Sequence, residues 1–276
     1  MKSITIDECH QLLLSIAVEF DKICIKHRIP YYMLGGTMLG AVRHNGFIPW
    51  DDDMDFGVPR SFYNRLIQAL SNELPSHLRV LTRENNEFAE FNYIKIDDTR
   101  TRLSDVWYDG KMALGIHIDI FPLDDGTKWP VCTYPFASYI AFLLRIKDYL
   151  AISPKKRKGF KKIIACALRC LFPLKTVWLL RFIAWCIQVF TAKYSKFYIN
   201  YYGHWHTKEV VRKTIFGIPK VYDFAGHSFL GINNANSYLK KLYGNYMKLP
   251  PKKKRLVHVA EMYYDDSTEN QIFPFH

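Results

Sequence analysis

Trp50-Asp51-Asp52-Asp53-Met54-Asp55-Phe56-Gly57 places four carboxylates within five residues. Two like charges about 4 Å apart repel by about 4 kcal/mol at an effective dielectric constant of about 20, so such side chains point to water or share a cation. Asp53 and Asp55 are two residues apart and would share one face of a strand, with apolar side chains at 54, 56 and 58 on the other. The alternation predicts a half-buried strand with a cation-binding carboxylate edge, the alternative being a solvated acidic turn.

A glycine turn precedes this stretch and predicts a phosphate-binding loop. The apolar run at 31–34 predicts a strand, which the pair Gly35-Gly36 follows. A helix is expected over Met38–Arg43, with Thr37 as its N-cap. Glycines let the backbone approach a ligand, and the free N–H groups of a helix N-terminus favour an anion.

Three other motifs are excluded by their spacing. A calcium loop of the EF-hand type would need Gly at Phe56 and Glu at Phe62. A Walker loop would need Gly-Lys-Ser/Thr after the turn, and glycines at 35, 36 and 40 do not have the spacing of a dinucleotide-binding fingerprint. The glycine turn therefore indicates a phosphate-binding loop only in combination with the carboxylate stretch that follows it in the chain.

Residues 34–55 closely resemble the signature of the LicD family. They read Leu-Gly-Gly-Thr-Met-Leu-Gly-Ala-Val-Arg-His-Asn-Gly-Phe-Ile-Pro-Trp-Asp-Asp-Asp-Met-Asp. The family includes bacterial phosphocholine transferases and fukutin-type sugar-alcohol phosphate transferases, and it is related to the polymerase-beta-like nucleotidyltransferases. The resemblance covers residues 10–125 well and 215–258 loosely. Residues 230–234 depart from the family, because they lack the proline-containing turn that is frequent there on the acceptor side.

A second block, residues 115–124, also resembles the family. Apolar residues alternate with His117 and Asp119, which predicts a strand over Ala113–Phe121 ended by Pro122. In nucleotidyltransferase-like folds a third carboxylate comes from such a strand, and Asp119 fits that role. The alternative for Asp119 is a cap at a strand end, and the alternative for a catalytic His117 is a structural role.

The resemblance implies a fold and a reaction. The fold is α/β, with a polymerase-beta-like nucleotidyltransferase core (a mixed sheet with flanking helices) and a helical insertion. The reaction is transfer of phosphocholine, or of a ribitol- or glycerol-type phosphate, from a CDP-activated donor to a sugar hydroxyl, with CMP released. The acceptor would be a cell-surface glycan or its lipid-linked precursor, and a choline group would call for an aromatic cage.

The same resemblance assigns roles to residues of the chain. Asp53, Asp55 and Asp119 are expected to be catalytic and to hold Mg²⁺ or Mn²⁺, with Asp51 as an outer or water-mediated ligand. Binding of the donor nucleotide is expected from a further set: Gly35, Gly36, Thr37, Arg43, His44 and Lys95. For Lys95, which shares a strand face with the residues at 93 and 97, a solvated position is the alternative.

Composition indicates a globular protein with an anionic partner. The 276 residues are 49% hydrophobic and carry a formal net charge of +12, which suits a nucleotide, a nucleic acid or an anionic membrane surface. The six cysteines include no Cys-x-x-Cys pair, and we interpret them as buried, reduced thiols. Asp7 and Glu8 precede the first apolar residues, so no secretory signal is expected.

The middle of the chain is basic and apolar. A basic cluster over Lys155–Lys162 precedes an apolar run over Ile163–Ala192 that charged residues and a proline interrupt, so a membrane span is not expected. We expect two or three helices, broken near Pro154 and Pro173, that either cap the sheet or also contact a membrane interface. Elsewhere the periodicity predicts helices over 7–28, 60–70 and 238–244, and strands over His77–Thr82 and Phe88–Ile96.

These features predict a catalytic core over 1–128, a helical insertion over 129–205 and a C-terminal segment over 206–276 that packs on the core. The expected location is cytoplasmic, peripheral at the inner face of the membrane, without nucleic acid as a partner. Two rivals stay open. One is a nucleotidyltransferase that uses a nucleoside triphosphate on a small molecule or protein, and the other is a non-catalytic basic protein that binds membrane or nucleic acid.

Overall fold

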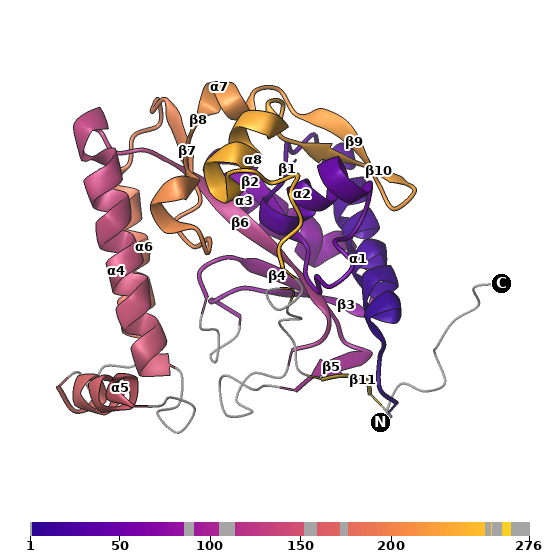
Figure 1. Cartoon of the computed structure of the whole chain (residues 1–276), viewed down its shortest axis with the longest axis horizontal. Helices are drawn as coiled ribbons and strands as arrows, with labels where there is room; N and C mark the ends of the chain where they lie inside the picture. Colours follow the sequence, from indigo (N-terminus) through magenta and orange to yellow (C-terminus); the bar gives the residue numbers. More distant parts are fainter. Residues whose placement is uncertain are drawn as a thin grey trace.

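A mixed β-sheet forms the centre of the molecule (Figure 1). The computed structural model describes residues 2–85, 91–104, 114–151, 159–171, 176–251, 255 and 261–265. The strands are β1 (Tyr32–Met33), β2 (Asp55–Pro59), β3 (Leu78–Leu81), β4 (Ile94–Asp98), β5 (Thr101–Leu103), β6 (His117–Asp125), β7 (Phe197–Ile199), β8 (Val210–Arg212), β9 (Lys220–Phe224), β10 (His227–Gly231) and β11 (Met262–Tyr264). The helices are α1 (Ile6–Lys26), α2 (Gly35–His44), α3 (Arg60–Glu73), α4 (Thr133–Ala151), α5 (Phe160–Leu171), α6 (Thr176–Phe190), α7 (Lys213–Phe216) and α8 (Ala235–Tyr243), with 3₁₀ turns η1 (Pro130–Cys132) and η3 (His206–Glu209).

The strand order in the sheet is β3-β4-β6-β2-β1-β10-β9. In addition, β7 pairs with the end of β6, and β8 pairs with β7. The pairs β2–β6 and β1–β10 are parallel, and the other pairs are antiparallel. The expected α/β fold with a mixed sheet and flanking helices is confirmed. Residues after 206 contribute β8, β9 and β10 to this sheet, while the three proposed domain boundaries stay a prediction.

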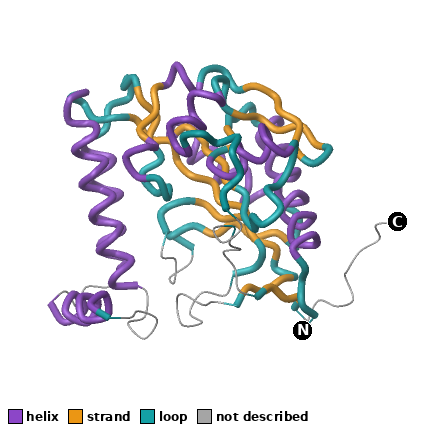
Figure 2. The backbone as a smooth tube through the Cα atoms, viewed as in Figure 1, coloured by secondary structure: helices purple, strands orange, loops and turns teal. Residues whose placement is uncertain are grey.

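Helices α1 and α3 pack on β6 and on each other because each has one apolar face. Figure 2 shows helices lying against the strands of the sheet. The first turn of α1 is a capping box, in which Thr5 accepts from the Glu8 N–H and Glu8 accepts from the Thr5 N–H. The predicted helices over 7–28 and 60–70 are confirmed, with α3 longer by three residues. Helix α8 ends at Gly244, as predicted, where a positive φ of 70° suits glycine.

Helices α4, α5 and α6 stand together at one side of the molecule (Figure 1). The prediction of two or three helices is confirmed, although Pro154 and Pro173 themselves lie outside the described residues. Helices α4 and α6 have a core of their own with β7 and β8, formed by Ala137, Ile140, Leu143, Ile183, Cys186, Ile187, Ile199, Tyr201 and Val210. Within the described ranges, no helix combines the length and the apolar character that crossing a bilayer requires.

The structure corrects the start of the acidic strand and of the helix before it. β2 begins at Asp55, so Asp53 lies in the preceding loop and the alternation argument does not apply to it. The reason is that β1, the neighbouring strand, ends at Met33, and the chain turns at once into α2. This helix starts at Gly35 rather than at Met38, and its N-cap is Leu34 rather than Thr37.

Two further strands differ from the prediction. Pro122 does not end β6, which runs to Asp125. Backbone N–H groups along a strand point alternately to its two sides. The N–H of Asp119 points to β2, so the nitrogen of Pro122, three residues later, points to the opposite side. Pro122 lies after the residues of β6 that pair with β4 and before those that pair with β7, so no strand lies beside its nitrogen. β4 covers 94–98 rather than 88–96, because β3 pairs along it as far as Asp98, while residues 88–90 lie outside the described part.

The cysteines are only partly buried, against the prediction. Cys9, Cys24 and Cys186 are buried, whereas Cys132 and Cys166 are exposed. Cys132 lies in the turn η1 and Cys166 on α5, both of which lie outside the main core. The side chain of Cys170 lies outside the described part of the chain.

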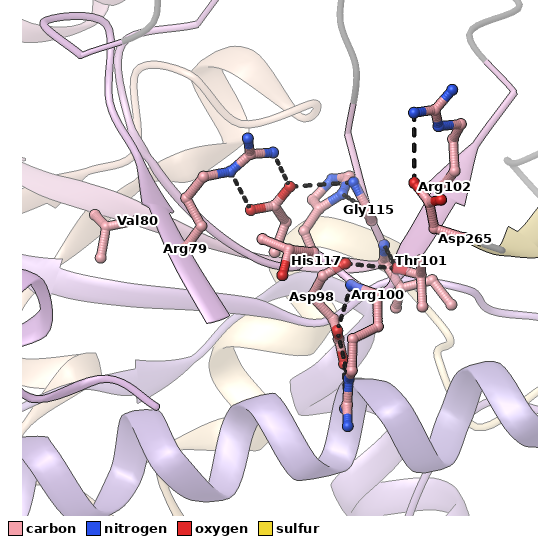
Figure 3. Close-up of polar contacts among 12 residues, drawn as sticks. Arg79, Val80, Asp98, Arg100, Thr101, Arg102, Gly115, His117 and Asp265 are labelled. Carbon is pink, nitrogen blue, oxygen red and sulfur yellow. Dashed lines mark hydrogen bonds and ion pairs between the residues drawn. The ribbon is translucent and has the colours of Figure 1, made fainter. Parts of the chain in front are cut away.

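A buried carboxylate ties β3, β4 and Gly115, two residues before β6, together. Asp97 has no exposed surface and accepts two hydrogen bonds from the Arg79 guanidinium, at 3.1 and 2.6 Å, and one from the Gly115 N–H at 3.1 Å. Arg79 and Gly115 are seen in Figure 3 beside the exposed Arg102–Asp265 pair, which spans 3.4 Å. The two pairs compare an aspartate with no exposed surface with one whose side chain is 27% exposed.

We expect Asp97→Ala to lower the free energy of unfolding by about 2–3 kcal/mol, because it removes the carboxylate that accepts two guanidinium hydrogen bonds and a buried N–H. Arg102→Ala, which removes the exposed pair, should change it by less than about 1 kcal/mol. Urea denaturation of both variants measures the difference. Equal effects would show that burial of Asp97 adds nothing.

Candidate functional site

Two parallel strands bring two of the predicted carboxylates side by side. In the register of β2 and β6, Asp55 lies opposite Asp119, so their side chains leave the sheet on the same face. Both side chains are half-buried and line a cleft of about 1030 Å³. The structure therefore brings together two of the three carboxylates that the sequence selected, Asp55 and Asp119, while their catalytic roles stay a prediction.

The other two aspartates reach the cleft from the loop between α2 and β2. Asp51 and Asp53 both line it, as do Gly35 and Gly36. A Cβ atom on Gly36 would lie 2.5 Å from an Asp51 carboxylate oxygen, and one on Gly35 would lie 3.3 Å from an Asp55 oxygen. Gly35 also has a φ of 47°, which favours glycine. The glycines thus let the carboxylates approach the N-terminus of α2, in addition to their predicted role at a phosphate.

Thr37, inside the signature, and His10, outside it, fix this loop. The Thr37 hydroxyl is buried and accepts the Asp55 N–H at 2.8 Å, which joins the first turn of α2 to β2. His10 on α1 donates from Nε2 to the Asp51 carbonyl at 2.7 Å, and its ring stacks on Phe47 with centroids 4.1 Å apart. Sequence reasoning missed His10 because nothing in the periodicity of α1 distinguishes it.

The carboxylates repel one another. Burial raises the pKa of Asp55 well above its usual value, and the negative charges of Asp53, Asp119 and Asp51 raise it further. Oxygen ligands of this kind suit a hard divalent cation, which would offset the repulsion. Among the residues that the structure describes, no three acidic, histidine or cysteine side chains already stand in the arrangement of a metal site. The chemistry of the set fits a divalent cation, and the carboxylates would have to close around it.

Lys95 already pairs with one of these carboxylates, which helps to explain why the described side chains do not stand in the arrangement of a metal site. Lys95 on β4 is buried, lies opposite Asp119 in the strand register, and donates to its carboxylate at 2.6 Å. The same ammonium lies 2.9 Å from His117 Nε2. His117 Nδ1 contacts the Gly115 carbonyl at 2.9 Å, so Nδ1 carries the proton and Nε2 accepts from the lysine. Burial and then the Lys95 charge lower the pKa of His117, which agrees with a neutral ring.

The predicted donor-binding residues differ in whether they line the cleft and in what they contact. Arg43 lines the cleft and donates to the Tyr246 carbonyl at 2.7 Å and to His44 Nε2 at 2.9 Å. His44 and Thr37 do not line the cleft. Lys95 lines it, but its ammonium is paired with Asp119. The contact of each residue with a phosphate stays a prediction.

A further part of the wall of the cleft was not predicted. It comes from residues 200–209 and from the end of α8, and it includes the aromatic rings of Trp205 and Tyr243, whose centroids are 5.0 Å apart. Glu209 is buried there and accepts the Trp205 N–H at 3.0 Å. It lies so close to Gly203 that any side chain at 203 would collide with its carboxylate. Only tertiary packing brings this segment to the acidic loop, so no local pattern signalled it.

Burial raises the pKa of Glu209 to about 7, against an ordinary value of 4.5. A carboxylic acid with a raised pKa destabilises the folded state once it ionises, so the free energy of unfolding should fall between pH 4.5 and 7 by about 3 kcal/mol from this group. Glu209→Gln keeps an acceptor for the Trp205 N–H and should remove that slope, which makes the variant the more stable protein above pH 7. Denaturation at a series of pH values measures this. Glu84→Gln, at an exposed glutamate, is the control, and parallel pH profiles for wild type and Glu209→Gln would contradict the assignment.

Comparison with known proteins agrees with the resemblance. A family model described as "LicD/FKTN/FKRP, nucleotidyltransferase domain" matches residues 28–142. The lipopolysaccharide cholinephosphotransferase LicD of Haemophilus influenzae is 30% identical over 273 residues, which cover 95% of this chain and 99% of that protein. Uncharacterized proteins of Rickettsia prowazekii and Rickettsia typhi are each 44% identical over 46 residues, or 17% of this chain, and these cover 17% and 15% of their own lengths.

Proposed function

The chain belongs to the LicD family, and on that premise we propose that it transfers phosphocholine or a related phospho-alcohol to a sugar hydroxyl. The donor would be a CDP-activated alcohol, and CMP would be released. The observation that carries the proposal is similarity along nearly the whole length of a lipopolysaccharide cholinephosphotransferase. The acceptor would be a cell-surface glycan, such as lipopolysaccharide, or its lipid-linked precursor, at the inner face of the cell membrane.

The paired carboxylates support a metal-dependent transfer. Asp53, Asp55 and Asp119 would hold Mg²⁺ or Mn²⁺, with Asp51 binding through water. When bound, the cation neutralises the diphosphate of the donor and helps to align it for in-line attack. The repulsion that raises the pKa of Asp55 supports this assignment, because a cation would relieve it. The parallel β2–β6 pair that carries Asp55 and Asp119 likewise supports a polymerase-beta-like nucleotidyltransferase core.

The surrounding residues of the chain would bind and orient the donor. Gly35 and Gly36 would leave the N-terminus of α2 open to phosphate oxygens. Arg43, held by the Tyr246 carbonyl, would add a fixed positive charge at the edge of the cleft. Trp205 and Tyr243 would offer ring faces to a quaternary ammonium group. Asp119 would accept the proton of the acceptor hydroxyl, with Lys95 and His117 holding its carboxylate in place.

A direct assay tests the proposal. The protein is incubated with CDP-choline, CDP-ribitol or CDP-glycerol, a glycan acceptor, and Mg²⁺ or Mn²⁺, and CMP release is measured. We expect CMP from one of these donors only when both metal and acceptor are present. Pyrophosphate release from a nucleoside triphosphate, with no CMP from any donor, would instead assign the protein to the nucleotidyltransferase rival.

A further inference from the structure

One face of α6 presents large apolar side chains to solvent. Trp178, Phe182, Trp185 and Val189 are 57%, 43%, 54% and 39% exposed. Their spacing of four, three and four residues places them in one stripe along the helix. Further exposed apolar side chains lie on the neighbouring helices of the same side of the molecule (Figure 1): Tyr139 and Phe142 on α4, and Phe160 and Ile163 on α5. Apolar surface gathered in this way marks an interaction site.

The stripe is not needed for the fold. The other side of α6 carries Leu180, Ile183, Cys186 and Ile187, all buried, and the last three pack with α4 and the end of the sheet. Leu180 also lines the cleft. A single helix therefore separates the cleft on its inner side from the apolar stripe on its outer side.

Charge identifies the kind of partner. Residues 129–196 contain one acidic residue, Asp148, and thirteen lysines and arginines. Acidic and basic residues are equal in number over the rest of the chain, so this segment accounts for the whole net charge of +12. Basic side chains border the apolar ones, since Arg181 lies 5.2 Å from the centre of the Trp178 ring, and Lys161 and Lys162 lie between Phe160 and Ile163.

We propose that α6, with the exposed residues of α4 and α5, docks the protein in the interfacial layer of an anionic bilayer. Tryptophan rings favour the boundary between headgroups and acyl chains, and basic residues beside them meet anionic headgroups. A second copy of the chain fits this face less well, because a two-fold contact would set two strongly positive segments against each other. Docking on this side places the membrane next to the helix that walls the cleft, where a lipid-linked acceptor would arrive. The docking itself depends on no step of the proposed chemistry.

Co-sedimentation with vesicles tests the docking. We expect wild type to bind vesicles that contain phosphatidylglycerol at low salt, to release them at high salt, and to bind pure phosphatidylcholine weakly. Trp178→Ser/Trp185→Ser should lower the partition coefficient by at least about tenfold, because burial of one such ring is worth more than the free energy of a tenfold change. The matched control is Ile25→Ser, at a residue 65% exposed on α1 at the other side of the molecule, and it should bind as wild type does.

Two measurements keep the result interpretable. Circular dichroism checks the fold of each variant, and quenching of wild-type tryptophan fluorescence by brominated lipid reports insertion without any substitution. Asp55→Asn should bind vesicles as wild type does, so a failed transferase assay would leave the docking proposal intact. Wild type that stays in the supernatant at low salt would overturn it. So would a dimer in sedimentation velocity that the double variant abolishes, because a second copy would then cover the face.

Discussion

Asp55→Asn is expected to abolish turnover and yet to raise the stability of the metal-free protein. Asp55 is the first residue of β2 and lies against Asp119 of β6, at the centre of the carboxylate set. Loss of one oxygen ligand with its charge removes the proposed metal clamp. In the metal-free fold, burial and the negative charges of neighbouring carboxylates raise the pKa of Asp55, so its ionised form costs stability at neutral pH. Asparagine carries no charge and should raise the free energy of unfolding by about 1 kcal/mol or more.

CMP release and thermal unfolding with and without Mn²⁺ test both parts. Wild type should gain stability from Mn²⁺, and Asp55→Asn should gain little, because a ligand stabilises only the state that binds it. Asp53→Asn should also lose turnover. Asp223→Asn, which removes an exposed carboxylate on β9, is the control and should keep both turnover and the metal effect. Near-normal turnover in Asp55→Asn or Asp53→Asn, with or without metal, would make the metal assignment wrong.

Local periodicity was sufficient to predict the strands around Asp55 and Asp119, because each buries an apolar face. The apolar side chains of Met54, Phe56 and Val58 are fully buried, as the alternation around the acidic stretch predicts. The alternation around Asp119 likewise placed that residue on the polar face of its strand, and the register then brings it to Asp55. Both predictions follow from the two-residue period of a strand, which depends only on neighbouring residues.

The remaining features depend on partners far away in the sequence. Asp53 falls outside β2 because β1 has already turned into α2, and Pro122 is tolerated in β6 because no strand lies beside its nitrogen. Lys95 was a candidate phosphate contact, but the antiparallel pairing of β4 with β6 sets its ammonium on Asp119. Glu209 and Trp205 reach the cleft only through the packing of the chain after the helical segment. A strand pairing or a buried charge depends on which segments meet, and that information is not local.

Asp119→Asn is expected to lower kcat by at least about a hundredfold, in the range of a lost general base, with a smaller effect on binding of the donor. The carboxylate lies on the polar face of β6 and is held by the Lys95 ammonium at 2.6 Å, which fixes its position beside Asp55. Asparagine keeps the shape and can still accept from the lysine, but it cannot take the proton of the acceptor hydroxyl. His117→Gln is the matched comparison, because a neutral ring that accepts from Lys95 only positions the lysine, and we expect a smaller loss.

Analysis of the reaction product separates the proposed enzyme from its nearest rival. Substitution of the carboxylates does not, because both enzymes need them. A phospho-alcohol transferase directs the acceptor hydroxyl to the distal phosphorus of the donor, so the glycan gains the alcohol phosphate and CMP leaves. A nucleotidyltransferase directs attack to the α-phosphorus, so the product gains the whole nucleotide. Mass spectrometry of the glycan distinguishes the two mass increments, and we expect that of the alcohol phosphate. A product that carries the nucleotide would assign the protein to the rival class. Unchanged kinetics in Asp119→Asn would make Asp119 a structural residue and transfer the role of base to Asp51 or His117.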